Sequence, residues 1–306
     1  MAYKMRSELS EAQIEADISN YLGWISPSVI PFRLIAVNEQ LTGADKKLNL
    51  AIPIYMQFKV SEGLMPISKF PHTFIPNFLY SHNSKPLNRI REYRRATDLF
   101  DRPTLYFKLR RIAIHAEDYQ HNVLFKLSNI PKCKAFYVAP LMLKDNEYQM
   151  SLFSSFHRPI YPFYHRNIDI YHDNWLSHIG TVPFLRAHIS IPPIERVNTD
   201  NHYYSFSTSG NDIAWHSKGS LVKEPVYRLG DTIKTILNNA VLNEYFWSTP
   251  KELLNSIRNE FNTESLIQFN DNQFPIDQLQ SFGEQLFALY GIKQFLLLTE
   301  REALSF

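Results

Sequence analysis

The chain has 306 residues, of which 44% are hydrophobic and 20% charged, and its formal net charge at pH 7 is +2. These proportions indicate a folded globular protein and exclude a disordered chain, and a total charge so close to zero does not by itself indicate a nucleic-acid partner. The single cysteine, Cys133, excludes an internal disulfide and a cysteine-rich zinc site and fits a reducing compartment. Because we find neither a signal-peptide pattern nor an apolar run of ~20 residues, we expect a cytoplasmic protein without a membrane partner.

Hydrophobic periodicity predicts the elements of the first half. Residues 10–22 are predicted to form a helix with Ser10 as its N-cap. Three strands are predicted next, at 32–37, 47–51 and 54–60. A basic helix at 88–99, a shorter helix at 121–127 and a buried strand at 135–143 follow. A short turn at 51–53 is expected to separate the second strand from the third.

The second half is less regular. Helices are predicted at 229–246, 250–261 and 278–290 and a strand at 203–207, whereas the aromatic stretch 153–175 fits no periodic pattern. A boundary between 145 and 180 divides the chain into an expected first domain, 1–150, and a C-terminal α+β region, 151–306. We expect the second region to contact substrate or partners.

One short segment carries the residues best suited to chemistry. The sequence Gly-Ala-Asp, ending at Asp45, is followed after eleven residues by Gln57, Phe58 and Lys59. Alternation along a strand places Gln57 and Lys59 on one face, with Met56 and Phe58 on the other. If the two flanking strands form a hairpin, Asp45 lies beside Gln57 and Lys59.

Phosphodiester hydrolysis needs such a set of groups. The Asp45 carboxylate, the Gln57 amide oxygen and the Phe58 carbonyl are suitable ligands for Mg²⁺ or Mn²⁺, hard ions that prefer oxygen. The Lys59 amine is suited to orienting the attacking water and to screening charge on the phosphate.

A further carboxylate is expected from the first helix. Glu11 and Glu15 are four residues apart and therefore share one helix face. Glu11 is favoured because it stands at the helix start, but the sequence leaves open which of the two reaches the metal.

A helix acid, Gly-Ala-Asp and Gln-x-Lys on a strand together resemble the PD-(D/E)XK (restriction-endonuclease-like) nuclease superfamily. They are most similar to its branch with Gln in place of the second acid, found among prokaryotic anti-phage defence effectors and Mrr-like enzymes. The resemblance covers residues 8–145 and implies an α/β fold with an αβββαβ core and a mixed sheet, with Asp45, Gln57 and Lys59 at the motif positions. It also implies a Mg²⁺-dependent DNA endonuclease that works as the effector subunit of a defence complex, with other protein subunits and self-association.

Two other functions stay open. Gln57 stands where the parent motif has an acid, and no proline precedes Asp45, which leaves room for a catalytically inactive relative that serves as a nucleic-acid-binding or structural subunit. An adaptor that acts only through protein contacts is the third function, and it would show no salt-dependent DNA binding. Taken singly, Asp45 also fits an ordinary turn and Lys59 an exposed sheet edge.

A basic stretch between 85 and 111 holds nine cations in 27 residues, interleaved with aromatic residues. This pattern suits phosphate contacts, and it equally suits a solvated helix face with aromatics turned to the core. The candidate nucleic-acid-binding residues are Arg89, Arg91, Arg94, Arg95, Arg110 and Arg111. The histidines at 157, 165, 172 and 178 have no metal-ligand spacing.

Overall fold

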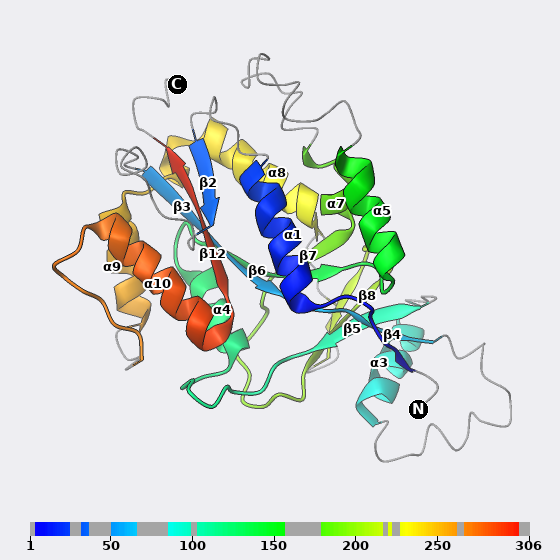
Figure 1. Cartoon of the computed structure of the whole chain (residues 1–306). Coiled ribbons are helices and arrows are strands. Elements are labelled where there is room, and N and C mark those ends of the chain that lie inside the picture. The colour runs from blue at the N-terminus through cyan, green and yellow to red at the C-terminus, as the bar shows by residue number, and fades with distance from the viewer. Residues whose placement is uncertain are drawn as a thin grey trace, which may run out of the picture.

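The computed structural model describes residues 4–24, 32–36, 50–65, 85–98, 103–156, 179–216, 220–221, 227–261 and 266–299. Within these ranges the chain forms two six-stranded sheets with helices packed around them, an α/β arrangement (Figure 1). The segment that contains Asp45 lies outside the described residues, as does most of the aromatic stretch.

One sheet, called the mixed sheet below, has the strand order β11-β7-β6-β3-β12-β2. Its strands are β2 (Phe32–Ala36), β3 (Leu50–Phe58), β6 (Lys134–Pro140), β7 (His188–Ile191), β11 (Tyr227–Arg228) and β12 (Lys293–Thr299). Strands β3 and β6 run parallel, and all the remaining neighbouring pairs are antiparallel. The mixed character expected of the sheet is therefore confirmed.

The expected hairpin between 47–51 and 54–60 is wrong. β3 runs unbroken through Pro53, and β12 lies between β2 and β3 and pairs with both. Pro53 is tolerated because Ala51 exchanges backbone hydrogen bonds with Ser248 on the side away from β12, while pairing with β6 begins only at Ile54. Proline has no N–H to donate. Pro53 lies between the Ala51–Ser248 bridge and the start of the β3–β6 pairing, so its missing N–H costs no ladder hydrogen bond.

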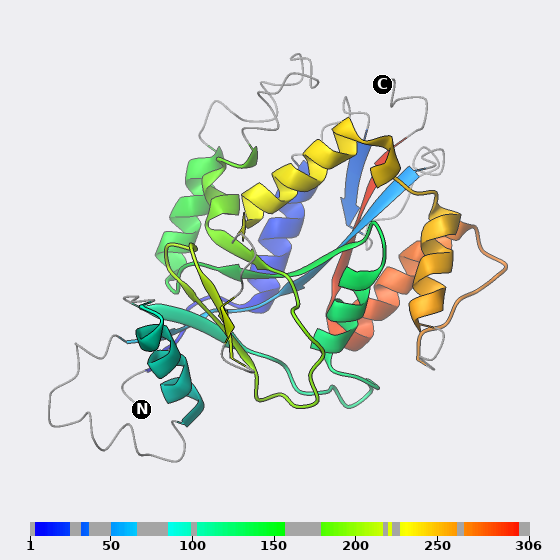
Figure 2. The ribbon, with the colours of Figure 1, turned by 180° about the vertical axis from the view of Figure 1, so that it is seen from behind.

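Helices pack on both faces of the mixed sheet (Figures 1 and 2). One face of β3, with Met56 and Phe58, joins a core with α1 (Glu11–Trp24), α5 (Asp145–Phe156), α7 (Pro183–Arg186) and α8 (Leu229–Leu242). The other face, with Ala51 and Tyr55, joins a core with α4 (Gln120–Asn129), α9 (Pro250–Phe261) and α10 (Pro275–Tyr290). Since alternate residues enter different cores, β3 is buried on both faces.

The second sheet, called the antiparallel sheet, has the order β1-β4-β5-β8-β9-β10. Its strands are β1 (Lys4–Met5), β4 (Glu62–Leu64), β5 (Thr104–Lys108), β8 (Tyr203–Ser207), β9 (Ile213–Trp215) and β10 (Ser220–Leu221). On one face Ile90 of α3 (Lys85–Ala96) packs against Leu64 and Tyr106, and Figure 1 shows α3 beside β4 and β5. Phe107 and Tyr204 on the other face join the core under α4, so the two sheets share a core.

Several local predictions are confirmed. The strand at 203–207 and the helix at 250–261 have the expected bounds, and Ser10 caps α1 by accepting a hydrogen bond from the Gln13 backbone N–H at 3.1 Å. The predicted helix at 88–99 is α3, three residues earlier at each end.

Both sheets contain strands from each side of residue 150, so the expected division into 1–150 and 151–306 does not separate two cores. β12 and β7 contribute to the mixed sheet, while β8 and β9 contribute to the antiparallel sheet. None of the helices in the described part of the chain combines the length and apolar character needed to cross a bilayer.

Candidate active site

Lys59 lies where the two sheets meet. It follows the last residue of β3, and its backbone N–H donates to the Val138 carbonyl at 2.9 Å. Its side chain is buried, and the ammonium donates to Oε1 of Gln120 at 2.7 Å. Burial lowers the pKa of Lys59 to about 8, an effect that nearby Glu11 opposes and Arg110 reinforces. A neutral amide oxygen compensates an ammonium less than a carboxylate would, so this lysine loses its proton more readily than an exposed one.

Gln120 connects Lys59 to the C-terminal part of the chain. It is the first residue of α4, it is buried, and its amide nitrogen donates to the Tyr290 carbonyl. Tyr290 ends α10, and Gly291 turns the chain into β12 with a φ of 64°, in the left-handed region that favours glycine. Sequence reasoning missed Gln120 because a polar residue at a buried helix start carries no motif.

Glu11 and Lys59 line one hollow of about 480 Å³. Its walls come from the start of α1, the end of β3, α3 and the antiparallel sheet. The other polar residues of the lining are Lys4, Glu62, Tyr106, Lys108 and Tyr203. Three lysines and two glutamates share the lining, but Lys4 pairs with Glu62 at 2.5 Å and Lys108 with Asp200 at 2.8 Å. Lys59 is the lysine of this lining whose bonded partner is a neutral amide.

Glu11 is held loosely. It begins α1, where a helix N-terminus favours a carboxylate, and it pairs with Arg110 at 3.3 Å. Both side chains of this pair are at least a third exposed, so the ion pair contributes little and leaves the carboxylate able to change partners.

Glu15 has a different position. It faces Lys293 at 3.5 Å, and Lys293 lies opposite Met56 in the β3–β12 ladder. Burial raises the pKa of Glu15, while Lys293 lowers it. Glu15 does not line the hollow, so of the two helix acids only Glu11 shares it with Lys59.

Gln57 and Lys59 follow the predicted alternation. Met56 and Phe58 enter the α1 core, whereas Gln57 pairs in register with Tyr137 of the α4 core. Gln57 is buried, and its amide nitrogen donates to the Phe58 carbonyl at 3.1 Å.

Of the ligands expected for a divalent ion, Glu11 lines the hollow beside Lys59, whereas Gln57 and Phe58 are not among its lining residues. Oε1 of Gln57 is buried and has no hydrogen-bond partner among the residues that the structure describes, so an uncompensated oxygen stands at a predicted ligand position. Hard cations accept such an oxygen together with carboxylates. No group of three acidic, histidine or cysteine side chains suited to a metal occurs within the described ranges, and Asp45 lies outside them.

The basic stretch divides into buried and exposed arginines. Arg94 pairs with Asp212 at 2.7 Å and is buried, and Arg91 is buried with one nitrogen donating to the Met65 carbonyl at 3.3 Å. These two arginines hold α3 to the antiparallel sheet, which corrects their expected role as phosphate ligands. The exposed arginines of the set are Arg89, Arg95, Arg110 and Arg111.

Comparison of the chain with protein-family models, with curated proteins and with solved structures finds no match. What this protein does must therefore be inferred from its own residues.

Proposed function

We propose that the chain is a metal-dependent nuclease that cleaves DNA phosphodiester bonds in the hollow lined by Glu11 and Lys59. The observation that carries this proposal is that a carboxylate from the start of α1 and the amine that follows β3 line the same hollow. These are the helix acid and the lysine of the motif that resembles PD-(D/E)XK nucleases, and they belong to elements that are distant in sequence.

Asp45, Glu11, Gln57 and the Phe58 carbonyl are the residues proposed to hold Mg²⁺ or Mn²⁺. Such an ion, when bound, polarises the phosphate and lowers the pKa of a water molecule. The buried, uncompensated oxygen of Gln57 is suited to a cation, although Gln57 is not among the residues that line the hollow.

Lys59 is proposed to donate a proton in a hydrogen bond from a fixed position in the hollow. With a pKa of about 8, its amine still carries a proton at neutral pH and donates a hydrogen bond to a phosphate oxygen or to the attacking water. Gln120 holds the amine in place without neutralising it.

Arg110 and Arg111 are the proposed contacts to the DNA backbone. Arg110 pairs with Glu11 at the rim of the hollow, and Arg111 is 85% exposed. The next apolar residues, Ile112 and Ile114, are also exposed, so this loop presents both cations and apolar groups beside the site.

The resemblance also supplies a proposed setting. In it the chain is the effector subunit of a prokaryotic anti-phage defence system, acts in the cytoplasm, and is restrained by other protein subunits or by self-association.

A catalytically inactive, nucleic-acid-binding subunit is the second candidate. It is favoured by one observation: Gln57 carries no charge, and its amide nitrogen is bonded to the Phe58 carbonyl, so two proposed ligands bond to each other. In this alternative the hollow and the exposed arginines bind nucleic acid without cutting it.

Cleavage assays with four matched proteins test the proposal. The full chain and its Lys59→Met, Glu11→Gln and Glu15→Gln variants are incubated with plasmid, single-stranded DNA and RNA in Mg²⁺, Mn²⁺ or EDTA. We expect Lys59→Met and Glu11→Gln to lose cleavage by about 100-fold or more. Glu15→Gln makes the same charge change one helical turn away and should retain most activity.

The binding of Mn²⁺ and of DNA is measured in parallel. Glu11→Gln should weaken Mn²⁺ binding, whereas Glu15→Gln should not. Cleavage that survives Lys59→Met would show that the assignment is wrong. Salt-dependent DNA binding without cleavage in any ion supports the inactive subunit, and absence of both supports an adaptor.

A further inference from the structure

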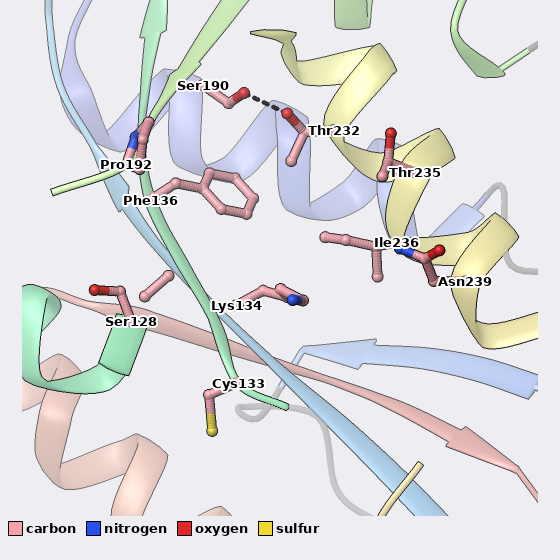
Figure 3. A pocket seen from close by; sticks show the side chains of 11 residues that line it. Ser128, Cys133, Lys134, Phe136, Ser190, Pro192, Thr232, Thr235, Ile236 and Asn239 are labelled. Atoms are coloured by element: carbon pink, nitrogen blue, oxygen red, sulfur yellow. Dashed lines mark hydrogen bonds between the residues drawn. The ribbon is translucent and has the colours of Figure 1, made fainter. Parts of the chain in front are cut away.

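A second hollow, of about 360 Å³, lies near the start of β6, whereas Lys59 follows the end of the parallel strand β3. Lys134, which lines this hollow, begins β6. This hollow lies between α8 and the strands β6 and β7 (Figure 3). It is therefore independent of the proposed nuclease site.

Lys134 provides the positive charge of this hollow. Figure 3 shows its side chain extending from β6 toward α8, and its ammonium lies 4.9 Å from the centre of the Phe246 ring. No acidic side chain lines the hollow. Burial lowers the pKa of Lys134, and no carboxylate is among the groups that act on it. A half-buried cation thus lacks a counter-ion within the described part of the chain.

Neutral hydrogen-bonding groups also line the hollow. Ser190 of β7 and Thr232 of α8 bond to each other at 2.5 Å across the gap between strand and helix, as Figure 3 shows. Thr235 and Asn239 line the same wall, three and seven residues after Thr232 on α8. Hydroxyl and amide groups of this kind are suited to bonding the oxygens of a small anion.

Apolar side chains complete the lining. Phe136 projects from β6 toward α8, with Ile236 on the facing helix (Figure 3). The volume lies within the range of small-molecule sites and exceeds what a bare phosphate fills. One cation, several neutral donors and an aromatic wall together match a ligand with one charged end and a compact carbon skeleton.

We propose that this hollow binds a small organic anion, with one phosphate or carboxylate group held by Lys134 and its carbon skeleton packed against Phe136 and Ile236. Phosphate and carboxylate share this recognition chemistry, so the choice between them is left to the experiment.

Calorimetric titration of the full chain with four probes tests the site. Phenyl phosphate and benzoate carry both features, inorganic phosphate carries only the charge, and benzyl alcohol carries only the ring. We expect saturable one-to-one binding of phenyl phosphate or benzoate with a Kd below about 1 mM, and weaker binding of the other two probes. The tighter of the two ring-bearing anions identifies the charged group.

Substitutions locate the bound probe. Lys134→Met should weaken binding at least about tenfold, and Lys134→Arg should restore part of it. Lys126→Met is the matched control, because Lys126 also lies over an aromatic ring, at 5.5 Å from Phe261, but outside this hollow. Lys59→Met controls for anion binding at the proposed nuclease site. Thermal melting shows whether each variant is folded. Asn239→Leu changes the lining of the hollow from α8 and leaves β6 unchanged, so it is a second test of the same site.

Three results would overturn the proposal. They are equal binding of benzyl alcohol and of the ring-bearing anions, no saturable binding of either anion up to about 10 mM, and anion binding that is lost in Lys59→Met but kept in Lys134→Met. None of them bears on whether the chain cleaves DNA.

Discussion

A hydrogen bond between Lys59 and Gln120 joins the end of strand β3 to the start of helix α4, two elements that are distant in the sequence. The ammonium that follows β3 donates at 2.7 Å to the side-chain oxygen of the first residue of α4. The same glutamine side chain donates to the Tyr290 carbonyl at the end of α10, so one amide group bridges Lys59 and the C-terminal part of the chain. The position of the amine therefore depends on residues far outside the motif that contains it.

The first prediction concerns this amide. Replacing Gln120 by Glu keeps the shape but places a carboxylate beside the ammonium, which favours the charged lysine and should raise the pKa of Lys59 from about 8 toward its ordinary value. NMR titration of ¹³C-labelled lysine side chains measures this, with Lys59→Met identifying the resonance. An unchanged midpoint in Gln120→Glu would show that the contact is not made in solution.

The second prediction separates structural from exposed arginines on α3. Arg94→Met removes the ion-pair partner of Asp212 and one of the hydrogen bonds of Ser205. Because the ion pair is largely buried, the substitution should lower the free energy of unfolding by about 2–3 kcal/mol. Urea unfolding measures the loss. Arg95→Met removes the same charge from an exposed position and should change stability by no more than about 0.5 kcal/mol. Equal losses in the two variants would contradict the assignment.

The arginine pattern also shows what the sequence could have revealed. Leu87, Ile90 and Arg94 recur at helical spacing, and this face of α3 packs on the antiparallel sheet. Extending the apolar stripe by one turn predicts that Arg94 is buried. Arg89 and Arg95 lie off that stripe and are exposed. The number of cations in the stretch does not distinguish the buried arginines from the exposed ones; their positions on the faces of the helix do.

Features set by local sequence were predictable, whereas the order of strands was not. The alternation that separates Gln57 from Met56 follows from a period of two, and the Ser10 cap follows from side-chain chemistry. The place of β12 between β2 and β3 depends on pairing across most of the chain. The apolar run Phe295–Leu298 after Gly291 indicates a buried strand but cannot name its neighbours.

The third prediction follows from that strand. A fragment of residues 1–150 contains β3 and β6 but lacks β12 and β7, so each of these buried strands loses one neighbour. We expect the fragment to lack cooperative unfolding in urea and to show poorly dispersed amide resonances. Adding an equimolar fragment of residues 151–306 should restore both properties in part. A 1–150 fragment that folds cooperatively alone would support the division into two domains.

The fourth prediction concerns acid stability and rests on His121. The ring is buried and stacks on Trp215 at 5.4 Å, with Nδ1 2.8 Å from the Tyr137 hydroxyl and Nε2 2.7 Å from the Glu195 carbonyl. Burial lowers its pKa from an ordinary value of 6.5 to about 4. The folded state thus binds a proton less readily than the unfolded state, so this stability is complete above pH 6.5 and is lost as the pH falls toward 4.

Between pH 7 and pH 5 this one histidine should lower the free energy of unfolding by about 2 kcal/mol, and His188, whose pKa burial also lowers to about 4, acts in the same direction. Urea unfolding at the two pH values measures the sum, to which His216, whose pKa burial also lowers to about 4, contributes. His121→Gln removes one titrating ring, so its unfolding free energy should fall less between the two pH values even if its stability at pH 7 is lower. His115 is exposed on the loop before α4, and His115→Gln should leave the pH dependence of the parent chain unchanged. If His121→Gln keeps the full acid-dependent loss, the neutral buried ring is not its source, and the stacked arrangement on Trp215 does not govern acid stability.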